Sequence, residues 1–544
     1  MTQIAWTQHL IIAPILLPLV VGAALILINE SRHQLKFAIN LLGTLALAGF
    51  ALALMTLTDS EYWQDGIGVY LSANWAAPFG IALLADRLTA AMLLLTAIIG
   101  MAALVFSMQR WSRVGVHFHS LFQLLLMGLN GAFLTNDLFN LFVFFEVMLA
   151  ASYGLVLHGY NLKRVRAGMQ YIAINLIASL LFLIGVALIY AASGTLNLAD
   201  LGGRVPGLEP DEQALLKAGT VVLALAFVTK GAMWPLGFWL PTTYAAASPP
   251  VAAMLVLMTK VGVYAALRLW MTVYSGTDNP LAGFGFEALL WGGIATLMFG
   301  AIGMFASQEP ERIAGYGAIM SSGVLLATVG YNQPSLLATG LYYLLGSTLA
   351  MGAFMLLIEL INRIRTPESA MLALTMEAFA IEDTPDDPVG VGIPATLAFL
   401  GLAFIASALV ITGMPPLSGF VAKFSMFHVL LNPLAFDGAP VSAVTWLLIA
   451  LVIVSGLFGI IALMRFGVRT FWAPDSIAPP RLLVSEAAPI TVLLLLCAVL
   501  TVQAGPTMEY LERSTRTLDQ PQIYAERVRS EPTVERAAPA EEQP

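Results

Sequence analysis

Apolar stretches of about 20 residues recur along the chain and are separated by short polar breaks. A helix of this length crosses the roughly 30 Å hydrocarbon core of a membrane. The alternation of period two that marks a transmembrane barrel is absent, so we expect helices. The pattern predicts about 14 of them, near residues 10–28, 37–57, 88–108, 118–136, 138–158, 169–192, 214–236, 250–274, 286–306, 313–330, 336–361, 395–431 (interrupted), 441–466 and 487–503.

The composition agrees with this pattern. Of the 544 residues, 59% are hydrophobic and only 11% are charged, and the mean hydropathy is +0.83. A chain of this kind could not stay dissolved as a water-facing globule. We therefore expect an all-α polytopic membrane protein.

Charges in the loops predict the orientation. Alternate loops carry most of the basic loop residues, for example Arg110, Lys163 and Arg465, whereas Arg204 is the basic residue of the opposite loops. By the positive-inside rule, both termini should face away from the cytoplasm.

Three further features lie outside or at the edge of this pattern. The acidic segment 366–388 is expected to be a solvated connector, and the polar tail 507–544 to be flexible or docked on a partner. The lone Cys497 lies in the last span and indicates neither a disulfide nor a thiol metal site. The chain has no phosphate loop, metal-ligand cluster or haem-ligating pair, so we expect no cofactor or metal, and no nucleic-acid partner.

Three of the six lysines, and none of the nineteen arginines, lie at membrane depth: Lys230, Lys260 and Lys423. Arg87 stands at a helix start, and Arg268 is near enough to the far interface to snorkel. Arginine stays charged, whereas a desolvated lysine can lose its proton. Each buried cation costs about 3 kcal/mol on insertion scales, which favours a functional role over structural ion pairing, the alternative for any one lysine.

One carboxylate lies at depth with these lysines. Glu146 is about nine residues into its span, which places it near the bilayer middle. A carboxylate near Lys230 would hold that ammonium charged until the carboxylate moved away or was protonated. Asp137, at the mouth of the same helix, could equally be an N-cap.

Two apolar segments are interrupted beside a lysine. Gly231 and Pro235 follow Lys230, and Pro415 and Pro416 precede Lys423. Broken helices are tolerated where the freed backbone groups meet protein or water, so the pattern predicts hydrated cavities in a transport path built from inverted repeats. Ordinary proline kinks are the alternative, but kinks do not explain a lysine at each break.

These motifs resemble one family over residues 80 to 470. "DLFNLFVFFEVML", "TKGAMWPLGFWLP", "ASPPVAAMLVLMTKVGVY" and "GMPPLSGFVAKF" are similar to the antiporter-like membrane subunits shared by respiratory complex I and the multisubunit Mrp (Mnh, Pha) cation/proton antiporters. The first motif and the chain length favour the D-type subunits of the Mrp antiporters. Lysine at position 423 favours the same assignment, because the related complex I subunit typically has glutamate there.

The resemblance implies 14 helices with inverted repeats formed by the fourth to eighth and the ninth to thirteenth helices, and with the seventh and twelfth helices broken. It divides the chain into five parts: the first three helices (residues 1–110), a first repeat (residues 111–274), a second repeat (residues 275–470), a last helix (residues 471–506) and the tail (residues 507–544). It implies a proton relay of four residues, which are Glu146, Lys230, Lys260 and Lys423. It also implies a bacterial inner-membrane location and partner subunits.

One position departs from the family pattern. The family often places a histidine where Gly346 stands, as a bridge between the lysines of the eighth and twelfth helices. We expect water in its place, ordered by candidate accessory residues Tyr342, Tyr343 and Ser347.

Three functions remain in view at this point. The first is the proton-translocating subunit of a Na⁺/H⁺ or K⁺/H⁺ antiporter, which would be a secondary transporter and not an enzyme. The second is a proton-pumping membrane subunit of a complex I-type NADH–quinone oxidoreductase, and the subunits that co-purify would separate the two. A stand-alone transporter for a small solute would need a pocket of oriented polar groups, for which the sequence gives no sign.

Overall fold

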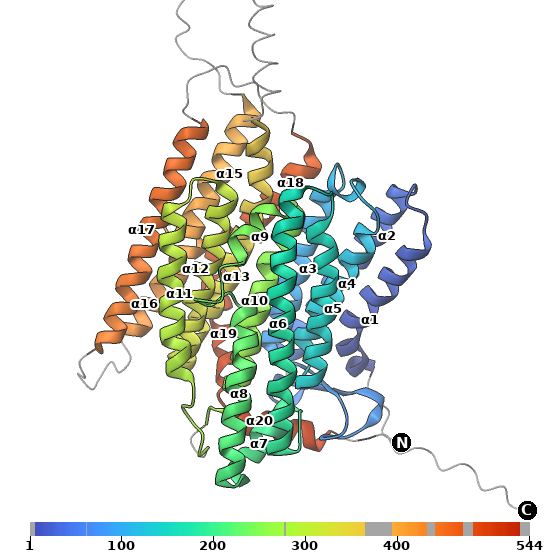
Figure 1. Ribbon diagram of the computed structural model, residues 1–544, viewed down its shortest axis with the longest axis vertical. Coiled ribbons are helices and arrows are strands. Elements are labelled where there is room, and N and C mark those ends of the chain that lie inside the picture. Colours follow the sequence, from blue (N-terminus) through green and yellow to red (C-terminus); the bar gives the residue numbers. More distant parts are fainter. Residues whose placement is uncertain are drawn as a thin grey trace, which may run out of the picture.

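A computed structural model describes residues 6–60, 62–276, 279–364, 394–431, 441–471, 482–531 and 533. These residues form an upright bundle of helices (Figure 1). Thirteen of the described helices are long and apolar enough to cross a membrane, and the 17-residue α4 (Phe118–Leu134) completes the 14 that were expected. The prediction of an all-α polytopic membrane protein is confirmed, while the acidic connector 366–388 lies outside the described residues.

The first three long helices are α1 (Trp6–Leu27), α2 (His33–Asp59) and α3 (Arg87–Ser107). Between α2 and α3 lies an antiparallel hairpin of β1 (Gly68–Leu71) and β2 (Ala82–Ala85). The hydropathy pattern did not predict this hairpin, because each strand has only four residues. Short 3-10 turns occur at Gln64–Gly66, Ser72–Asn74, Trp111–Arg113 and Val205–Gly207.

The next group contains the first interrupted helix. After α4 come α5 (Leu138–Leu157), α6 (Leu162–Ser193), α7 (Leu198–Arg204), α8 (Pro210–Lys230), α9 (Leu240–Ala246) and α10 (Pro249–Val273). Proline at the first position and acidic residues in the first turn favour the start of α8 at Pro210. The helix ends at Lys230, so the break lies where the glycine and proline predicted it.

The following group contains the second break. It comprises α11 (Phe286–Ala306), α12 (Pro310–Gly330), α13 (Pro334–Ile364), α15 (Ala395–Thr412), α16 (Ser418–Leu431) and α17 (Ala443–Phe471), followed by α18 (Val484–Val502). In Figure 1, α8 rises from the lower end of the bundle toward α9, whereas α15 descends from the upper end toward α16. The two interrupted helices therefore run in opposite directions, as inverted repeats require.

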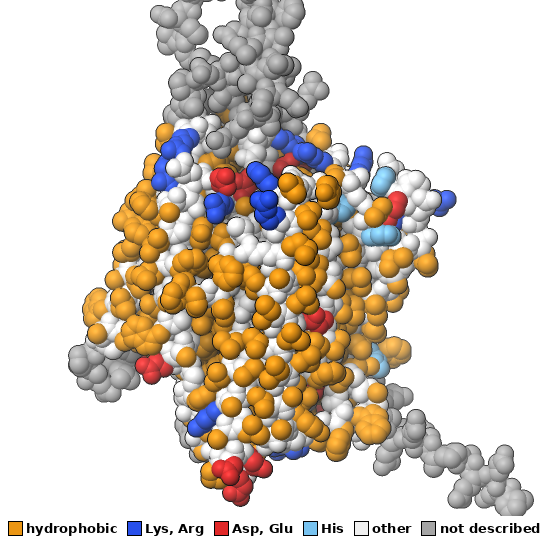
Figure 2. Space-filling model, in the orientation of Figure 1, with side chains coloured by type: hydrophobic (Ala, Val, Ile, Leu, Met, Phe, Trp, Pro, Cys, Tyr) orange, Lys and Arg blue, Asp and Glu red, His pale blue; other side chains and the backbone are white. Residues whose placement is uncertain are grey.

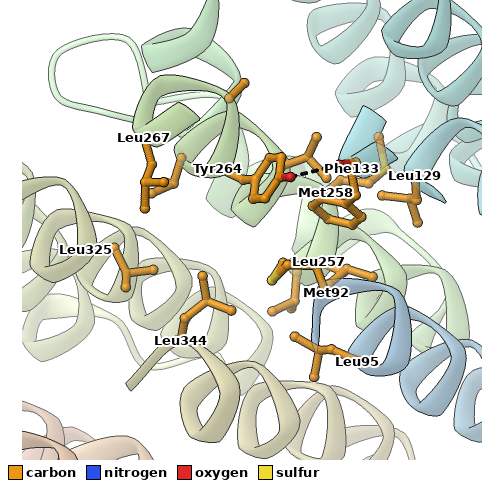
Figure 3. Close-up of a cluster of buried hydrophobic side chains, with 14 of the residues drawn as sticks. Met92, Leu95, Leu129, Phe133, Leu257, Met258, Tyr264, Leu267, Leu325 and Leu344 are labelled. Carbon is orange, nitrogen blue, oxygen red and sulfur yellow. Dashed lines mark hydrogen bonds between the residues drawn. The ribbon is translucent and has the colours of Figure 1, made fainter. Parts of the chain in front are cut away.

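Helix α10 is the centre of the bundle. Its most apolar 18-residue window is entirely buried. Figure 3 shows side chains of α10 packed among those of α3, α4, α12 and α13, and the Tyr264 hydroxyl donates a 2.7 Å hydrogen bond to the Phe133 carbonyl oxygen. A charged residue on this helix is consequently surrounded by protein and not by lipid.

The tail differs from the expectation. Residues up to Ser530 are neither flexible nor free of the bundle, because they form α19 (Ala504–Leu518) and α20 (Pro521–Ser530), which pack on the chain itself. The Tyr510 hydroxyl donates to the Arg87 carbonyl oxygen (2.9 Å), and the Tyr524 hydroxyl donates to Asp86 (2.8 Å). The average composition of the tail is polar, but its apolar and aromatic residues recur at helical spacing and give each helix one buried face.

The two ends of the described chain meet. The Gln8 side chain donates a hydrogen bond to Glu531, so α1 begins where the tail helices end. Figure 2 shows Lys and Arg side chains gathered at the upper end of the bundle and a group of acidic side chains at the lower end. The concentration of basic side chains at the upper end agrees with the loop charges on which the predicted orientation depends.

Candidate functional site

The break after α8 is held by side chains as well as backbone. Ala232 has a left-handed backbone (φ +57°), and the Met233 N–H donates to the Val228 carbonyl oxygen. The Trp234 N–H, which no longer has a helical acceptor, donates to Thr296 Oγ1 of α11 (2.8 Å). The freed backbone groups thus find partners inside the protein, as a break at membrane depth requires.

Lys230 is the last residue of α8 and its side chain is buried. Its ammonium nitrogen lies 5.1 Å from the centre of the Phe145 ring and has no hydrogen-bond partner among the described residues. Gly262 lets α10 approach this helix end, since a Cβ there would lie 2.8 Å from the Lys230 carbonyl carbon. Lys230 is therefore a buried cation without a direct ion pair.

Glu146 of α5 is the nearby opposite charge. It acts electrostatically on Lys230, although no oxygen of Glu146 lies within ion-pair distance of the ammonium. Its carboxylate accepts a hydrogen bond from the Ser179 hydroxyl of α6. Glu146 and Lys230 are therefore neighbours, as expected, but their charged groups are too far apart for an ion pair.

Asp137 has a different place. It is the N-cap of α5 and accepts a 2.8 Å hydrogen bond from the Asn140 N–H. Burial raises the pKa of the Asp137 carboxyl, and the backbone N–H groups that it accepts from oppose this shift. The cap interpretation therefore describes its geometry.

Lys260 lies in the wholly buried part of α10 and is 1% exposed. Its ammonium donates to the Ser321 hydroxyl of α12. The Ser347 hydroxyl lies 3.4 Å from the Ser321 hydroxyl, and the Tyr343 side chain lies close to Ser321. Of the three candidate accessory residues, Tyr343 and Ser347 are thus gathered at Lys260.

Tyr342 is not part of this group. Its hydroxyl donates to the Leu500 carbonyl oxygen of α18 (2.7 Å), so it is committed to helix packing. At Gly346, where a histidine is often found, a Cβ would lie 3.0 Å from the Ser418 hydroxyl at the start of α16. In this packing, a side chain at position 346 would be in tight contact with Ser418.

The second break brings Lys423 back onto the preceding helix. Pro415 and Pro416 lie between α15 and α16, and the Lys423 ammonium donates a 2.7 Å hydrogen bond to the Thr412 carbonyl oxygen at the end of α15. Gly413 has φ +77°, and a Cβ on it would lie 2.5 Å from the Lys423 side chain. Glycine at 413 is required both by this backbone conformation and by the lysine beside it.

Lys230 and Lys423 share one electrostatic feature. Each lies at the C-terminal end of the half-helix that precedes a break, where the helix dipole is negative and stabilises a cation. Lys230 reaches this position as the last helical residue, and Lys423 reaches it by folding back from α16. The sequence predicted a lysine beside each break, but not that the two lysines would reach the helix end in different ways.

Arg268 requires a correction. Its side chain does not extend into the surroundings but is only 11% exposed, and it donates to Asp86 (2.6 Å) and to Thr89 (2.8 Å). Tyr524 of α20 donates to the same carboxylate. The expectation was wrong because position along a helix does not reveal what covers that end of the bundle, here the tail.

Several site residues had no recognisable signal in the sequence. Ser179, Ser321 and Thr296 are ordinary hydroxyl residues in apolar helices, and only their partners distinguish them. No group of three or more His, Cys, Asp or Glu residues that could hold a metal ion occurs in the part of the chain that the structure describes.

Comparison with known proteins gives a consistent result. The family model described as "NADH:quinone oxidoreductase/Mrp antiporter, TM" matches residues 135–436. The chain is 51% identical over 531 residues to the D-type subunit of the probable K⁺/H⁺ antiporter of Rhizobium meliloti (strain 1021), covering 97% of this chain and 98% of that protein. It is 34% identical over 536 residues to the D-type subunit of the Na⁺/H⁺ antiporter of Alkalihalophilus pseudofirmus, covering 96% and 100%.

Solved structures share the fold. A chain of the Mrp complex from Dietzia sp. DQ12-45-1b superposes with a TM-score of 0.80 at 24% identity, covering 97% of this chain and 100% of that chain. A chain of respiratory complex I from Thermus thermophilus with bound NADH gives 0.72 at 22%, covering 94% and 99%.

The fold is that of a polytopic membrane subunit. The chain belongs to the NADH:quinone oxidoreductase/Mrp antiporter family of membrane subunits, and the relatives that it resembles are named as antiporter subunits.

Proposed function

We propose that this chain is the proton-translocating subunit of a multisubunit monovalent cation/proton antiporter, and that Glu146, Lys230, Lys260 and Lys423 form its proton relay. The observation that supports this most directly is the burial of the three lysines away from carboxylates. All three are buried, and among the described residues none has a carboxylate within ion-pair distance.

A fixed structural role would favour closely paired charges. A buried cation without a partner is costly, and a lysine relieves that cost by releasing its proton. Each lysine instead has an alternative to a salt bridge, which is an aromatic face at Lys230, a hydroxyl at Lys260 and a helix-end carbonyl at Lys423. These weaker partners keep the charged and neutral forms close in free energy, as a relay requires.

Glu146 would control the first lysine. Because it acts on Lys230 across a gap, protonation of the carboxylate or a small movement of α5 relative to α6 changes the electrostatic stabilisation of the ammonium. The hydrogen bond from Ser179 holds the carboxylate in place between such events.

The proposal includes the exchanged cation and the orientation of the chain in the membrane. The 51% identical relative carries K⁺/H⁺ in its name, which favours K⁺, while the more distant relative carries Na⁺/H⁺. The basic end of the bundle would face the cytoplasm of a bacterial inner membrane, and both termini would then lie on the opposite side, where Gln8 meets Glu531. The alternative of a complex I subunit is less favoured, because these relatives are named antiporter subunits.

The test uses the complete complex in proteoliposomes with an imposed pH gradient. K⁺ and Na⁺ are added separately, and dissipation of the gradient is followed with a pH-sensitive dye. Lys230→Ala and Lys230→Arg should both abolish exchange, since arginine cannot release a proton. Lys217→Arg is the matched control, because Lys217 lies on the same helix with its ammonium 5.7 Å from the centre of the Phe284 ring.

Two outcomes would oppose the proposal. Robust exchange by Lys230→Arg would leave Lys230 a fixed cation, and co-purification with flavin and iron–sulfur subunits would assign the chain to a redox enzyme.

A further inference from the structure

Lys260 occupies a central position between the two interrupted helices. It lies on α10, and its ammonium points to α12, not to α8 or α16. Among the described residues it has no carboxylate within ion-pair distance, and Ser321 is the side chain that accepts its hydrogen bond. The orientation of the Lys260 ammonium therefore depends on the Ser321 hydroxyl.

Among the described residues, the Ser321 hydroxyl bonds no carbonyl of its own helix, which leaves it available to Lys260. Buried serines and threonines in apolar helices commonly donate to a carbonyl three or four residues earlier. Thr348, Ser407 and Ser455 of this chain all do so. The Ser321 hydroxyl instead contacts the Ser347 hydroxyl of α13 (3.4 Å), and the Tyr343 side chain lies nearby.

Gly346, next to Ser347 on α13, leaves little space for the histidine that could otherwise connect the helices. A Cβ at Gly346 would lie 3.0 Å from the Ser418 hydroxyl and 3.5 Å from the Ser418 Cβ. These distances leave little room for a histidine unless α16 moves. The connection between α10 and α13 consequently passes through hydroxyl groups.

We propose that Ser321 is a positioning residue that holds the Lys260 ammonium at α12, links it through Ser347 to α13, and thereby connects the first repeat with the second. This inference rests on the proposed relay function of Lys260. A hydroxyl suits the role because it accepts from the ammonium while donating to a second oxygen, here that of Ser347. It carries no charge of its own, so Lys260 keeps its ability to change charge.

The experiment compares Ser321→Ala with Ser322→Ala in the intact antiporter complex. Ser322 is the matched control, because it is a buried serine on the same helix whose hydroxyl has no partner among the described residues. Exchange rates are measured from pH 6 to about 9, a range chosen around neutral operation. The abundance of the assembled complex is measured in parallel.

We expect Ser321→Ala to lower the exchange rate about tenfold and to move the pH optimum toward acid. The shift has this sign because the lost hydrogen bond is made by the protonated ammonium, so its removal disfavours the protonated form. Ser321→Thr, which keeps the hydroxyl, should restore the optimum, and Ser322→Ala should leave it unchanged. A purely structural role for Ser321 would change the abundance of the complex but not the position of the optimum.

Two further variants, Ser321→Cys and Lys260→Gln, separate a folding defect from a loss of positioning and test the relay role of Lys260. If Ser321→Ala does not assemble, Ser321→Cys keeps the side-chain size with a weaker hydrogen bond and must show the same acid shift. Lys260→Gln separates the two claims: if it remains active, the relay role of Lys260 is wrong. If Lys260→Gln is inactive while Ser321→Ala matches Ser322→Ala in rate and optimum, only the positioning role is overturned.

Discussion

The ammonium of Lys423 donates a 2.7 Å hydrogen bond to the carbonyl oxygen of Thr412, the last residue of α15. Eleven positions separate the two residues, and the chain between them turns through Pro415 and Pro416. The lysine thus satisfies a carbonyl that the break leaves without a helical N–H, at the negative end of the half-helix dipole. The same break that creates the site supplies its hydrogen-bond acceptor.

Replacing Lys423 should separate a titratable role from a purely cationic one. We expect Lys423→Ala to reduce exchange about a hundredfold, the usual loss when a proton-transfer group is removed. Lys423→Glu should keep a fraction of the activity with an optimum at lower pH, because only a protonated carboxyl can donate to the Thr412 carbonyl oxygen. The check is a pH series of K⁺-dependent exchange, and equal, complete loss in both variants would argue for a strictly cationic role.

Gly456 of α17 provides an independent test of this contact. A Cβ at position 456 would lie 2.9 Å from the Thr412 carbonyl oxygen and 3.4 Å from the Lys423 ammonium. Gly456→Val should therefore displace the lysine and slow exchange by about tenfold or more, equivalent to ~1.4 kcal/mol on the barrier. Gly401→Ala on α15 is the control, since a Cβ there has no neighbour within 4 Å. Similar rates for the two variants would show that the lysine does not need its present position.

Glu146 and Asp137 should respond differently to neutralisation. Glu146→Gln removes the charge that acts on Lys230 and should nearly abolish exchange. Asp137→Asn should be mild, because asparagine is as good an N-cap as aspartate and can still accept from the Asn140 N–H. Both variants are assayed in the same complex, and an equal loss for Asp137→Asn would give that carboxylate a role beyond capping.

The sequence predicted the spans, the two breaks and the lysines beside them, because hydropathy, proline and charge are properties of single positions or short windows. It could not predict the partners. Ser321 and Ser179 resemble many other hydroxyl residues in apolar helices, and only the packing of α10 on α12 and of α5 on α6 selects them. The tail helices were missed for a related reason, since their buried faces depend on helices far earlier in the chain, such as α13 and α7, and on single residues such as Asp86.

The Asp86–Arg268 pair should be a structural element that depends on pH. Burial alone would raise the pKa of Asp86, but the Arg268 guanidinium outweighs it and lowers that pKa from 3.8 to about 2. A depressed folded-state pKa stabilises the protein above the unfolded value, and this contribution is lost as the pH falls from about 4 toward 2. Arg268→Ala should destabilise the folded protein by about 3–5 kcal/mol, because it leaves a buried carboxylate unpaired.

Thermal unfolding of the purified complex at pH 7 and at lower pH checks this expectation. Tyr524→Phe, which removes one hydrogen bond to the same carboxylate, should cost less, about 1.5–3 kcal/mol. An Arg268→Ala variant as stable as the parent at pH 7 would contradict the structural role of the pair.

The last prediction is that this chain alone does not exchange cations. A Na⁺ or K⁺ site wants several oxygen ligands, usually including carboxylates. The carboxylates buried in the part of the chain that the structure describes are largely committed, with Asp86 held by Arg268, Glu486 by Arg363, and Asp200 by Arg204 and Arg529. Three buried lysines repel a metal ion but suit proton transfer. We therefore expect the cation path to lie mostly in partner subunits, coupled electrostatically to the lysine charge states.

The measurement places the chain by itself in membranes of a strain that lacks its own Na⁺ and K⁺ antiporters. Vesicles from these cells should show no K⁺- or Na⁺-dependent proton movement, whereas vesicles containing the full set of subunits should. Lys230→Ala in the full set is the matched negative control, because it removes the proton side while leaving the partner subunits present. Clear exchange by the lone chain, abolished by Lys230→Ala, would refute this division of labour and place a cation site within this subunit.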